Sequence, residues 1–441
     1  AFSLMLYFLI TYFTERTETF QLFSLYGVLF LLYWLWSRQV KTAEQIHLGL
    51  ILALIFRLVL LPALPNLSDD IFRFIWDGRL LLNGINPFAE LPSFYNAHPE
   101  IHIPGINNEL YDQLNSPEYF TIYPPVAQFV FWLSVLFSKE NLLISVIIIR
   151  VLIILAEIGS IVIARKLLII YNLPEKNILW YALNPLVILE LTGNLHFEAF
   201  MIFGLLLSIY AFEKKWPYVS SLAFAFAICS KLLPLIFLPL LIRRMKFQEV
   251  IRYFLLTGTA TFLMFTPLVS KELIHGLTQS LSLYFQKFEF NASFYYLIRQ
   301  IGYWIKGYNI IETAGKVLAL STFLGIIIYS WFERKMNRPL AQSFLWALLF
   351  YLSLSTTVHP WYVIPLLALS IFSSYQFSIL WTFMVFLTYF TYRTTAYMEN
   401  QWLVVLEYFS VFGLLLVEWV RKNDKTKRKK SHLELSYYQK E

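Results

Sequence analysis

Two neighbouring carboxylates, Asp69 and Asp70, begin a polar segment that follows a long apolar run. Ser68 can cap a helix whose first turn carries both acids, where backbone N–H groups favour negative charge. On that helix Arg73 and Asp77 share a face with Asp70, because they lie three and seven residues further on. Such a segment suits a general base that accepts a proton from a substrate hydroxyl. A helix cap with a salt bridge is the alternative interpretation.

Asp70 is the preferred base of the two acids, because Arg73 and Asp77 on its face can hold its side chain toward a substrate. Asp69 points roughly 100° away around the same helix, so the two carboxylates cannot serve equally. We expect Asp69 to bind an acceptor or to tune Asp70, and Arg73 and Asp77 to contribute to substrate binding. A divalent ion on the pair lacks support, because two adjacent carboxylates make an incomplete oxygen shell.

Two cations stand out as candidate phosphate ligands. Lys231 is isolated within an apolar run, and a lysine inside a membrane is costly without an anionic partner. We expect it to bind a lipid phosphate, although a lysine can also extend its ammonium to the interface. Arg393 is the second candidate, with Glu399 as a possible partner.

The remaining candidates are polar or aromatic side chains in turns between apolar runs. Hydroxyls of a sugar can hydrogen-bond to the polar groups, and the C–H face of a pyranose ring can stack on the aromatic ones. Ordinary interfacial aromatic belts and structural histidines are the alternatives. The predicted substrate-binding residues of this kind are Tyr123, Asn194, His196, Glu198, His359, Trp361 and Tyr362.

The composition shows what kind of protein must position these residues. Of the 441 residues 58% are hydrophobic and 14% charged, against roughly a quarter charged in soluble domains. Long apolar runs recur along the chain, and its mean hydropathy is +0.59. We therefore expect an all-α polytopic integral membrane protein. The single Cys229 excludes an internal disulfide framework, and the seven scattered histidines offer no zinc spacing.

The apolar runs predict about 13–15 membrane helices in one transmembrane domain, residues 1–420. The stretch 217–242 fits best as two short helices that meet at Lys231, and 126–138 as a re-entrant or tilted segment. The chain begins inside an apolar run without a methionine, so we expect a further segment to precede Ala1. The predicted runs are 1–13, 20–36, 47–64, 143–164, 178–192, 199–212, 217–242, 250–269, 315–331, 339–357, 361–373, 376–390 and 402–420.

Charge placement predicts the orientation of the chain in the membrane. Residues 421–441 carry eight basic and three acidic side chains, so we expect a cytoplasmic basic tail held by anionic lipids, not a nucleic-acid site. The segment 65–125 has eight acidic residues, two arginines and no lysine, a net charge of −6. We expect this large loop, and a second loop at 270–312, on the non-cytoplasmic side. The turns 193–198, 358–361 and 391–401 should face the same side.

The order of motifs resembles a known family. The acidic pair is followed by Arg-x-x-Trp-Asp-Gly-Arg at 73–79, Gly-x-Asn-Pro-Phe at 84–88 and Ile-Tyr-Pro-Pro at 122–125. This order resembles the bacterial polyprenyl-phosphate-sugar-dependent glycosyltransferases of the GT-C fold and, more distantly, the first mannosyltransferase of glycosylphosphatidylinositol anchor synthesis. Weaker matches follow at 184–186, 193–198, 230–234, 290–296 and 359–362. Many relatives separate their acids as Asp-x-Asp, so the adjacent pair leaves open which one is the base.

The resemblance implies a GT-C-like bundle whose large first loop, with its juxtamembrane helices, is catalytic. It further implies an inverting hexosyl transfer, mannose first, from a polyprenyl-phosphate sugar to a glycan or glycolipid hydroxyl, without a cofactor. The site would face outward from a bacterial cytoplasmic membrane. A glycine-rich nucleotide cradle is not present in the sequence, which argues against a nucleotide-sugar donor. A lipid or solute transporter and a non-catalytic assembly scaffold are the alternatives.

Overall fold

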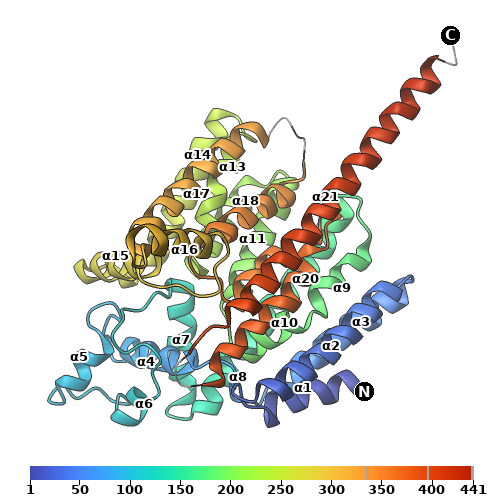
Figure 1. Ribbon diagram of the computed structural model, residues 1–441. Helices are drawn as coiled ribbons and strands as arrows, with labels where there is room; N and C mark the ends of the chain where they lie inside the picture. Colours follow the sequence, from blue (N-terminus) through green and yellow to red (C-terminus); the bar gives the residue numbers. More distant parts are fainter. Residues whose placement is uncertain (334–335, 337, 395–396, 439–441) are drawn as a thin grey trace.

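The computed structural model describes residues 1–333, 336, 338–394 and 397–438. Within these ranges the chain is helical, with one isolated parallel bridge between Phe290 and Thr357 as its only β pairing. Figure 1 shows the helices α1 to α21 gathered into an elongated bundle, with α4, α5 and α6 grouped at one end. The predicted all-α polytopic membrane fold is confirmed.

The first half of the chain builds a helical hairpin, the large loop and the central helices. The helices are α1 (Phe2–Phe13), α2 (Thr19–Gln39), α3 (Ala43–Val59), α4 (Asp70–Leu82), α5 (Pro92–Ala97), α6 (Asn108–Asp112), α7 (Pro125–Ser138), α8 (Leu142–Ile170), η1 (Glu175–Asn177), α9 (Ile178–Ala182), α10 (Pro185–Val187), the π-helix η2 (Ile188–Gly193), α11 (Glu198–Glu213) and α12 (Pro217–Ser230).

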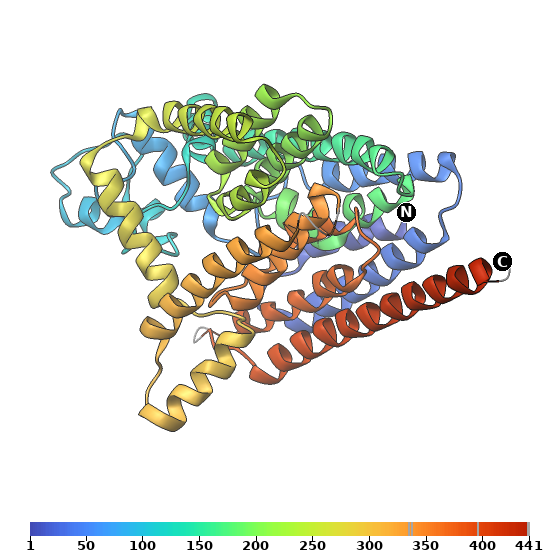
Figure 2. The ribbon, with the colours of Figure 1, turned by 90° about the horizontal axis from the view of Figure 1, so that it is seen from above.

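The second half adds η3 (Leu233–Phe237), α13 (Leu238–Ile242), α14 (Phe247–Phe265), η4 (Thr266–Leu268), α15 (Lys271–Gln286), α16 (Phe294–Lys306), α17 (Ile311–Glu333), α18 (Leu340–Leu354), η6 (Pro360–Val363), α19 (Ile364–Ser370), α20 (Phe377–Met384), η7 (Val385–Arg393) and α21 (Gln401–Tyr438). Figure 2 shows α21 along one edge of the bundle, where it packs on α20. The predicted tail from 421 continues this helix up to Tyr438.

Five helices in the described part of the chain are long and apolar enough to cross a membrane, and a bent pair makes a sixth. Six shorter apolar helices of 10–17 residues accompany them, too short for a straight crossing of about 20 residues. The prediction of 13–15 membrane helices therefore exceeds the number that meets this length, although apolar helices occupy the predicted runs. The spans are Thr19–Gln39, Leu142–Ile170, Phe247–Leu268, Ile311–Glu333 and Gln401–Asp424.

The predicted break at Lys231 is confirmed. Helix α12 ends at Ser230, Lys231 takes an extended conformation with φ −161°, and the chain resumes as the short helices η3 and α13. Pro234 sits near the start of η3, where its missing N–H costs least. The lysine therefore stands at the gap between two helices and not on a continuous helical face.

A second break lies between η2 and α11, whose axes differ by 114° across Asn194–Phe197. Arg150 on α8 stabilises this break, because its guanidinium donates to the carbonyl oxygens of Thr192 at 2.7 Å and Gly193 at 2.8 Å. These carbonyls end a helix and have no partner inside it.

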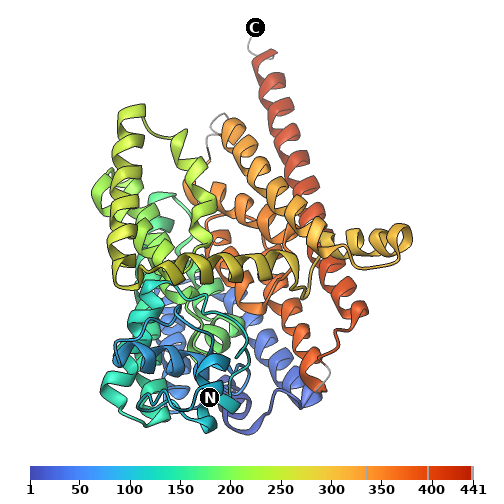
Figure 3. The ribbon, with the colours of Figure 1, turned by 90° about the vertical axis from the view of Figure 1, so that its left-hand side faces the viewer.

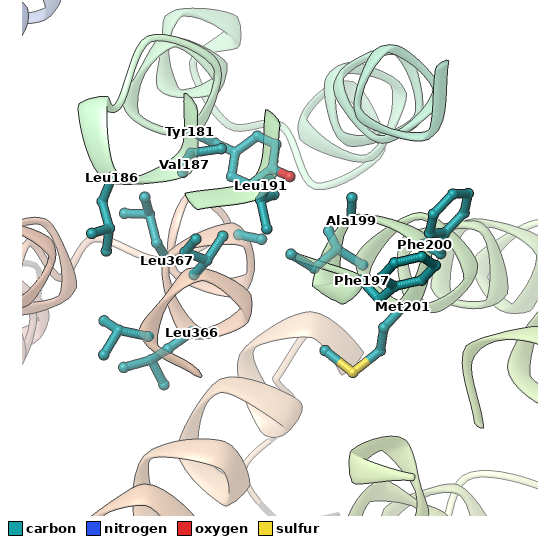
Figure 4. Packing of buried hydrophobic residues seen from close by; sticks show 14 of the residues in the cluster. Tyr181, Leu186, Val187, Leu191, Phe197, Ala199, Phe200, Met201, Leu366 and Leu367 are labelled. Atoms are coloured by element: carbon teal, nitrogen blue, oxygen red, sulfur yellow. The ribbon is translucent and has the colours of Figure 1, made fainter. Parts of the chain in front are cut away.

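The core of the molecule surrounds this break. Figure 4 shows side chains from α9, η2 and α11 packed with those of α19. Buried apolar side chains of this kind contribute roughly 1.5–3 kcal/mol each on removal from water, so they fix the turn that carries three of the candidate residues. The labelled residues are Tyr181, Leu186, Val187, Leu191, Phe197, Ala199, Phe200, Met201, Leu366 and Leu367.

Candidate active site

The two acids at the start of α4 bind different partners. The Asp70 carboxylate accepts hydrogen bonds from the Asn115 amide at 2.9 Å and the Tyr123 hydroxyl at 3.3 Å. Asp69 instead forms an ion pair with Arg16 at 2.6 Å, from the connection between α1 and α2. Helix α4 begins at Asp70 with Asp69 as its N-cap residue, in place of the predicted cap at Ser68 and a first turn carrying both acids. Asp70 faces the segment that closes the large loop.

Arg73 and Asp77 form a buried ion pair of 2.9 Å. The other Asp77 oxygen accepts hydrogen bonds from Thr121 and Gln128, and Arg73 also donates to the carbonyl oxygens of residues 116 and 119. Because both side chains are at most 5% exposed and bonded to protein, the geometry gives them a positioning role in place of the predicted substrate contact. They hold the closing segment of the loop against α4.

An apolar cavity of about 350 Å³ lies between η3 and α13 on one side and α17 and α18 on the other. Its polar lining includes Lys231, Glu198 and Tyr362. The Lys231 ammonium pairs with the Glu198 carboxylate and lies 4.7 Å from the centre of the Tyr362 ring. The lysine keeps 30% of its side chain exposed, whereas Glu198 is 2% exposed. A long apolar chain with a charged end would match this lining.

The loop carboxylate and the cavity are joined by the closing segment of the large loop. Ile122 lines the cavity, and the next residue, Tyr123, donates its hydroxyl hydrogen to Asp70. The Tyr123 ring also contacts Phe197, the residue before Glu198, with 6.4 Å between ring centres. Asp70 and Lys231 are therefore connected through directly contacting neighbours.

Four rings form a stack beside Lys231. Phe290, His359, Trp361 and His196 lie nearly parallel, with successive ring centres 4.8, 4.5 and 3.8 Å apart. Burial lowers the pKa of His359 to about 3, and the nearby charges of Lys231 and His196 add to this shift. His359 is therefore neutral at physiological pH, and the stack brings two predicted sugar-binding turns together.

A buried carboxylate holds the 193–198 turn. Glu190 accepts hydrogen bonds from the Tyr389 hydroxyl at 2.6 Å and the Asn194 amide at 3.0 Å, and its Oε2 lies 3.2 Å from the His196 Nε2. Asn194 and His196 were predicted as sugar contacts; the Glu190 carboxylate holds the Asn194 amide by a hydrogen bond, whereas the nearby His196 Nε2 makes none. Both side chains are nearly fully buried.

The predicted pairing of Arg393 with Glu399 is wrong. Glu399 accepts hydrogen bonds from the Asn291 N–H at 2.6 Å and from the Tyr296 hydroxyl. Burial raises the pKa of Glu399, an effect that these two hydrogen bonds and Arg299 oppose. Arg393 is exposed and lies over the Phe390 ring at 4.0 Å, so its phosphate contact stays a prediction.

The described residues contain no group of three or more His, Cys, Asp or Glu side chains able to hold a metal ion. Asp69 is engaged by Arg16, and Asp70 by Asn115 and Tyr123.

Residues 5–245 match the family model described as alpha-(1->6)-mannopyranosyltransferase, N-terminal domain. This match spans more than half of the chain. The chain belongs to this family. No curated protein matches it. As an alpha-(1->6)-mannopyranosyltransferase family member it is a glycosyltransferase of the mannosyltransferase type that uses a sugar donor and a glycan acceptor, so the transporter and scaffold interpretations lose their basis.

The mannopyranosyltransferase match includes the loop acids, the 193–198 turn and Lys231, whereas the His359–Tyr362 turn and Arg393 lie beyond it. The cavity is thus built from both parts of the chain, because η3 lies inside the matched region and α17 and α18 lie outside.

Sequence reasoning missed two side chains that direct the acids, Arg16 and Asn115, because nothing near them in the sequence links them to α4. Glu190 could have been recognised from the sequence. An acidic side chain inside an apolar run such as 178–192 is energetically costly in a membrane and is usually functional.

Tyr392 was also missed, and it lies where several of these charges meet. Burial raises the pKa of its hydroxyl; Arg16 opposes the shift, and Asp70, Glu190 and Asp69 add to it. Its ring lies 5.2 Å from the Arg16 guanidinium. Tyr392 therefore lies beside Arg16, which pairs with Asp69, and its ring is 5.8 Å from that of Tyr389, which donates to Glu190.

Proposed function

We propose that this protein transfers mannose from a polyprenyl-phosphate mannose donor to a glycan or glycolipid hydroxyl with inversion at the anomeric carbon. The observation that carries the proposal is the apolar cavity with Lys231 in its polar lining, connected through Ile122 and Tyr123 to the Asp70 carboxylate. A lipid donor needs both an apolar surface for its chain and a cation for its phosphate.

The donor phosphate would take the place of Glu198 as the anion beside Lys231. The ammonium is partly exposed in the cavity, so a phosphate can reach it from the apolar side. Hydrogen bonds between an ammonium and a phosphate are charge-assisted and stronger than neutral ones. The prenyl chain would occupy the apolar lining between η3 and α17.

Asp70 would act as the general base. The acceptor hydroxyl gives its proton to the carboxylate while its oxygen forms the new bond to the anomeric carbon. The bond from that carbon to the phosphate oxygen breaks on the opposite face, and polyprenyl phosphate leaves with both bonding electrons. Because inversion exchanges the two anomeric forms, the α linkage of the family name requires a β-linked donor.

Asn115 and Tyr123 would orient the base through the two hydrogen bonds that Asp70 accepts. The donor sugar would lie near the His196 and Trp361 rings, with Asn194 and His359 beside it. Glu190 would hold the 193–198 turn in place. The reaction would occur on the outer side of a bacterial cytoplasmic membrane, with the C-terminus in the cytoplasm. Positive charge favours the cytoplasmic side, so the basic tail would lie there and the acidic loop 65–125 on the other side.

The test offers purified protein a polyprenyl-phosphate mannose, a polyprenyl-phosphate glucose and GDP-mannose, each with a mannose-terminated acceptor. Transfer from the polyprenyl-phosphate mannose, with an α product and full activity in EDTA, is the expected result. Transfer from GDP-mannose alone would overturn the donor assignment, and retention of the donor configuration would overturn the single displacement.

A further inference from the structure

Helix α16 presents an apolar stripe that no other described part of the chain covers. Leu297, Trp304 and Ile305 are 62%, 76% and 73% exposed, and Phe294 and Ile301 are also exposed. Positions 294, 297, 301 and 304 follow one another at spacings of three or four residues, and 305 is four residues after 301, which places all five on one face of a helix. An exposed apolar face of this kind marks an interaction surface.

The other side of α16 is polar. Arg299 pairs with Glu289 at 2.5 Å, and Tyr295 donates to the same carboxylate at 2.7 Å. Lys306, on the same side as Arg299, is exposed. Separate apolar and polar sides, with a tryptophan on the apolar side, are typical of a helix that lies in the plane of a membrane interface.

The position of α16 in the bundle agrees with this. Figure 3 shows α16 projecting sideways, across the direction of α21. Its 13 residues span about 20 Å, too short to cross a hydrocarbon core of about 30 Å. The next helix, α17, is a candidate span with exposed Val317, Leu320 and Phe323, so the stripe adjoins a surface suited to lipid.

We propose that the apolar stripe of α16 lies in the interface of the lipid bilayer, and that the segment before α16 connects this interfacial helix to the wall of the donor cavity. The coupling is a backbone bridge. The Phe290 N–H donates to the Thr356 oxygen at 3.1 Å, and the Val358 N–H donates to the Phe290 oxygen at 2.8 Å. Thr356 and Thr357 line the cavity that contains Lys231.

Asn291 strengthens this connection. Its side-chain amide donates to the Val358 carbonyl oxygen at 3.3 Å and to Glu407 on α21 at 3.1 Å, and its backbone carbonyl oxygen accepts from the Tyr408 hydroxyl at 2.6 Å. The segment before α16 is thus held by two sides of the bundle. A helix that lies among the lipid headgroups would hold the adjoining cavity wall at headgroup depth in the membrane. This is the depth at which a lipid phosphate lies. This last step rests on the proposed lipid donor.

Spin labels test the interfacial position of α16 without any substrate. In a Cys229→Ala background, a cysteine replaces Trp304, Leu297 or, as the matched control on the other side, Lys306. The protein is placed in vesicles of phosphatidylethanolamine and phosphatidylglycerol, and label collisions with oxygen and a water-soluble nickel complex are compared. We expect labels at 297 and 304 to favour oxygen at a depth of about 5–10 Å, and the label at 306 to favour nickel.

Two results would contradict the interfacial position of α16. Equal nickel access at all three positions would mean that the stripe faces water. Labels at 297 and 304 that are shielded from both reagents, with spin–spin broadening, would mean that a second copy covers the stripe.

The coupling is tested by Leu297→Glu with Trp304→Glu, against Lys306→Glu, which makes the same change of two charge units on the other side of the helix. Because the altered apolar side chains are exposed, the fold should survive. We expect kcat/KM for a long-chain donor in vesicles to fall by about tenfold for the first variant only, with turnover of a short-chain donor in detergent unchanged. Equal losses in vesicles and detergent would overturn the coupling. Absence of transfer by the unaltered protein would refute the proposed function and leave the label result standing.

Discussion

Two regions of the molecule bury charge in opposite ways. Beneath the break between η2 and α11, Arg57 and Glu157 form an ion pair of 2.7 Å with both side chains at most 1% exposed. Glu157 also accepts from the Thr192 hydroxyl, and Arg57 donates to the carbonyl oxygens of residues 53 and 182. By contrast, Lys231 at the cavity and Asp69 at the start of α4 keep exposed surface, with 30% and 38% of their side chains accessible.

The difference distinguishes a network that supports the fold from a region that is available for binding and catalysis. A closed network, in which every charge is paired inside the protein, leaves no group for a ligand and rigidifies the turn above it. The open region has a cation beside an apolar cavity and a half-buried acid at a helix start. We therefore expect changes in the first region to affect stability, and changes in the second to affect binding and turnover.

The largest effect on stability is expected for Glu157→Gln. The change leaves the Arg57 guanidinium buried without its counter-charge, and breaking a buried pair in this way costs about 3–5 kcal/mol. The free energy of unfolding in detergent, followed by denaturant titration, provides the measurement.

Glu175→Gln is the matched control. Glu175 pairs with Arg165 at 2.6 Å, but both side chains are more than a third exposed, so the loss should be about 0–1 kcal/mol. Equal losses for the two variants would remove the distinction between the closed network and an ordinary surface pair.

The next effect concerns the cavity. Lys231→Ala should weaken donor binding roughly 10- to 150-fold, since charge-assisted hydrogen bonds contribute about 1.5–3 kcal/mol. Binding of a polyprenyl-phosphate mannose to the purified protein is measured by calorimetry. Lys271→Ala, an exposed lysine on α15, is the control and should bind normally.

The lysine also neutralises Glu198, so a second variant separates the two roles. In Lys231→Ala with Glu198→Gln the unpaired carboxylate is gone. If the weak binding persists, the lysine contacts the phosphate; full recovery would return Lys231 to a structural role.

A smaller effect is expected from His359 as the pH falls. Its pKa is about 3 in the folded protein against 6.5 for an unperturbed histidine, so the unfolded chain binds the extra proton more readily. Stability should therefore fall as the pH decreases from 6.5 toward 3. Melting temperatures of His359→Phe should decline less over this range than those of the original protein. An identical decline would mean that His359 is not held neutral.

Much of the fold could be predicted, because apolar runs mark helices and charges mark their ends. The break at Lys231 was visible as a cation within an apolar run. The predicted number of membrane helices exceeds the number of helices long enough for a straight crossing, because several predicted runs form short or broken helices such as α12 with η3 and α19 with η6.

The partners of the acids could not be predicted. Asn115 reaches Asp70 across 45 residues and Arg16 reaches Asp69 across 53, and only tertiary packing brings them together. Glu399 was assigned to a cation six residues away, whereas the fold gives it to Tyr296, 103 residues distant. Nearness in a loop does not determine an ion pair.

The central claim is that Asp70 is the base, and a comparison of Asp70→Asn with Asp69→Asn tests it most directly. Asparagine keeps the shape of the side chain and removes the proton acceptor. Single-turnover transfer with bound polyprenyl-phosphate mannose should slow by about 10²–10⁴-fold for Asp70→Asn, with donor affinity unchanged. Asp69→Asn should retain most of its rate, because its carboxylate is engaged by Arg16. Near-normal transfer by Asp70→Asn would contradict the account, whether Asp69→Asn is inactive or both variants remain active.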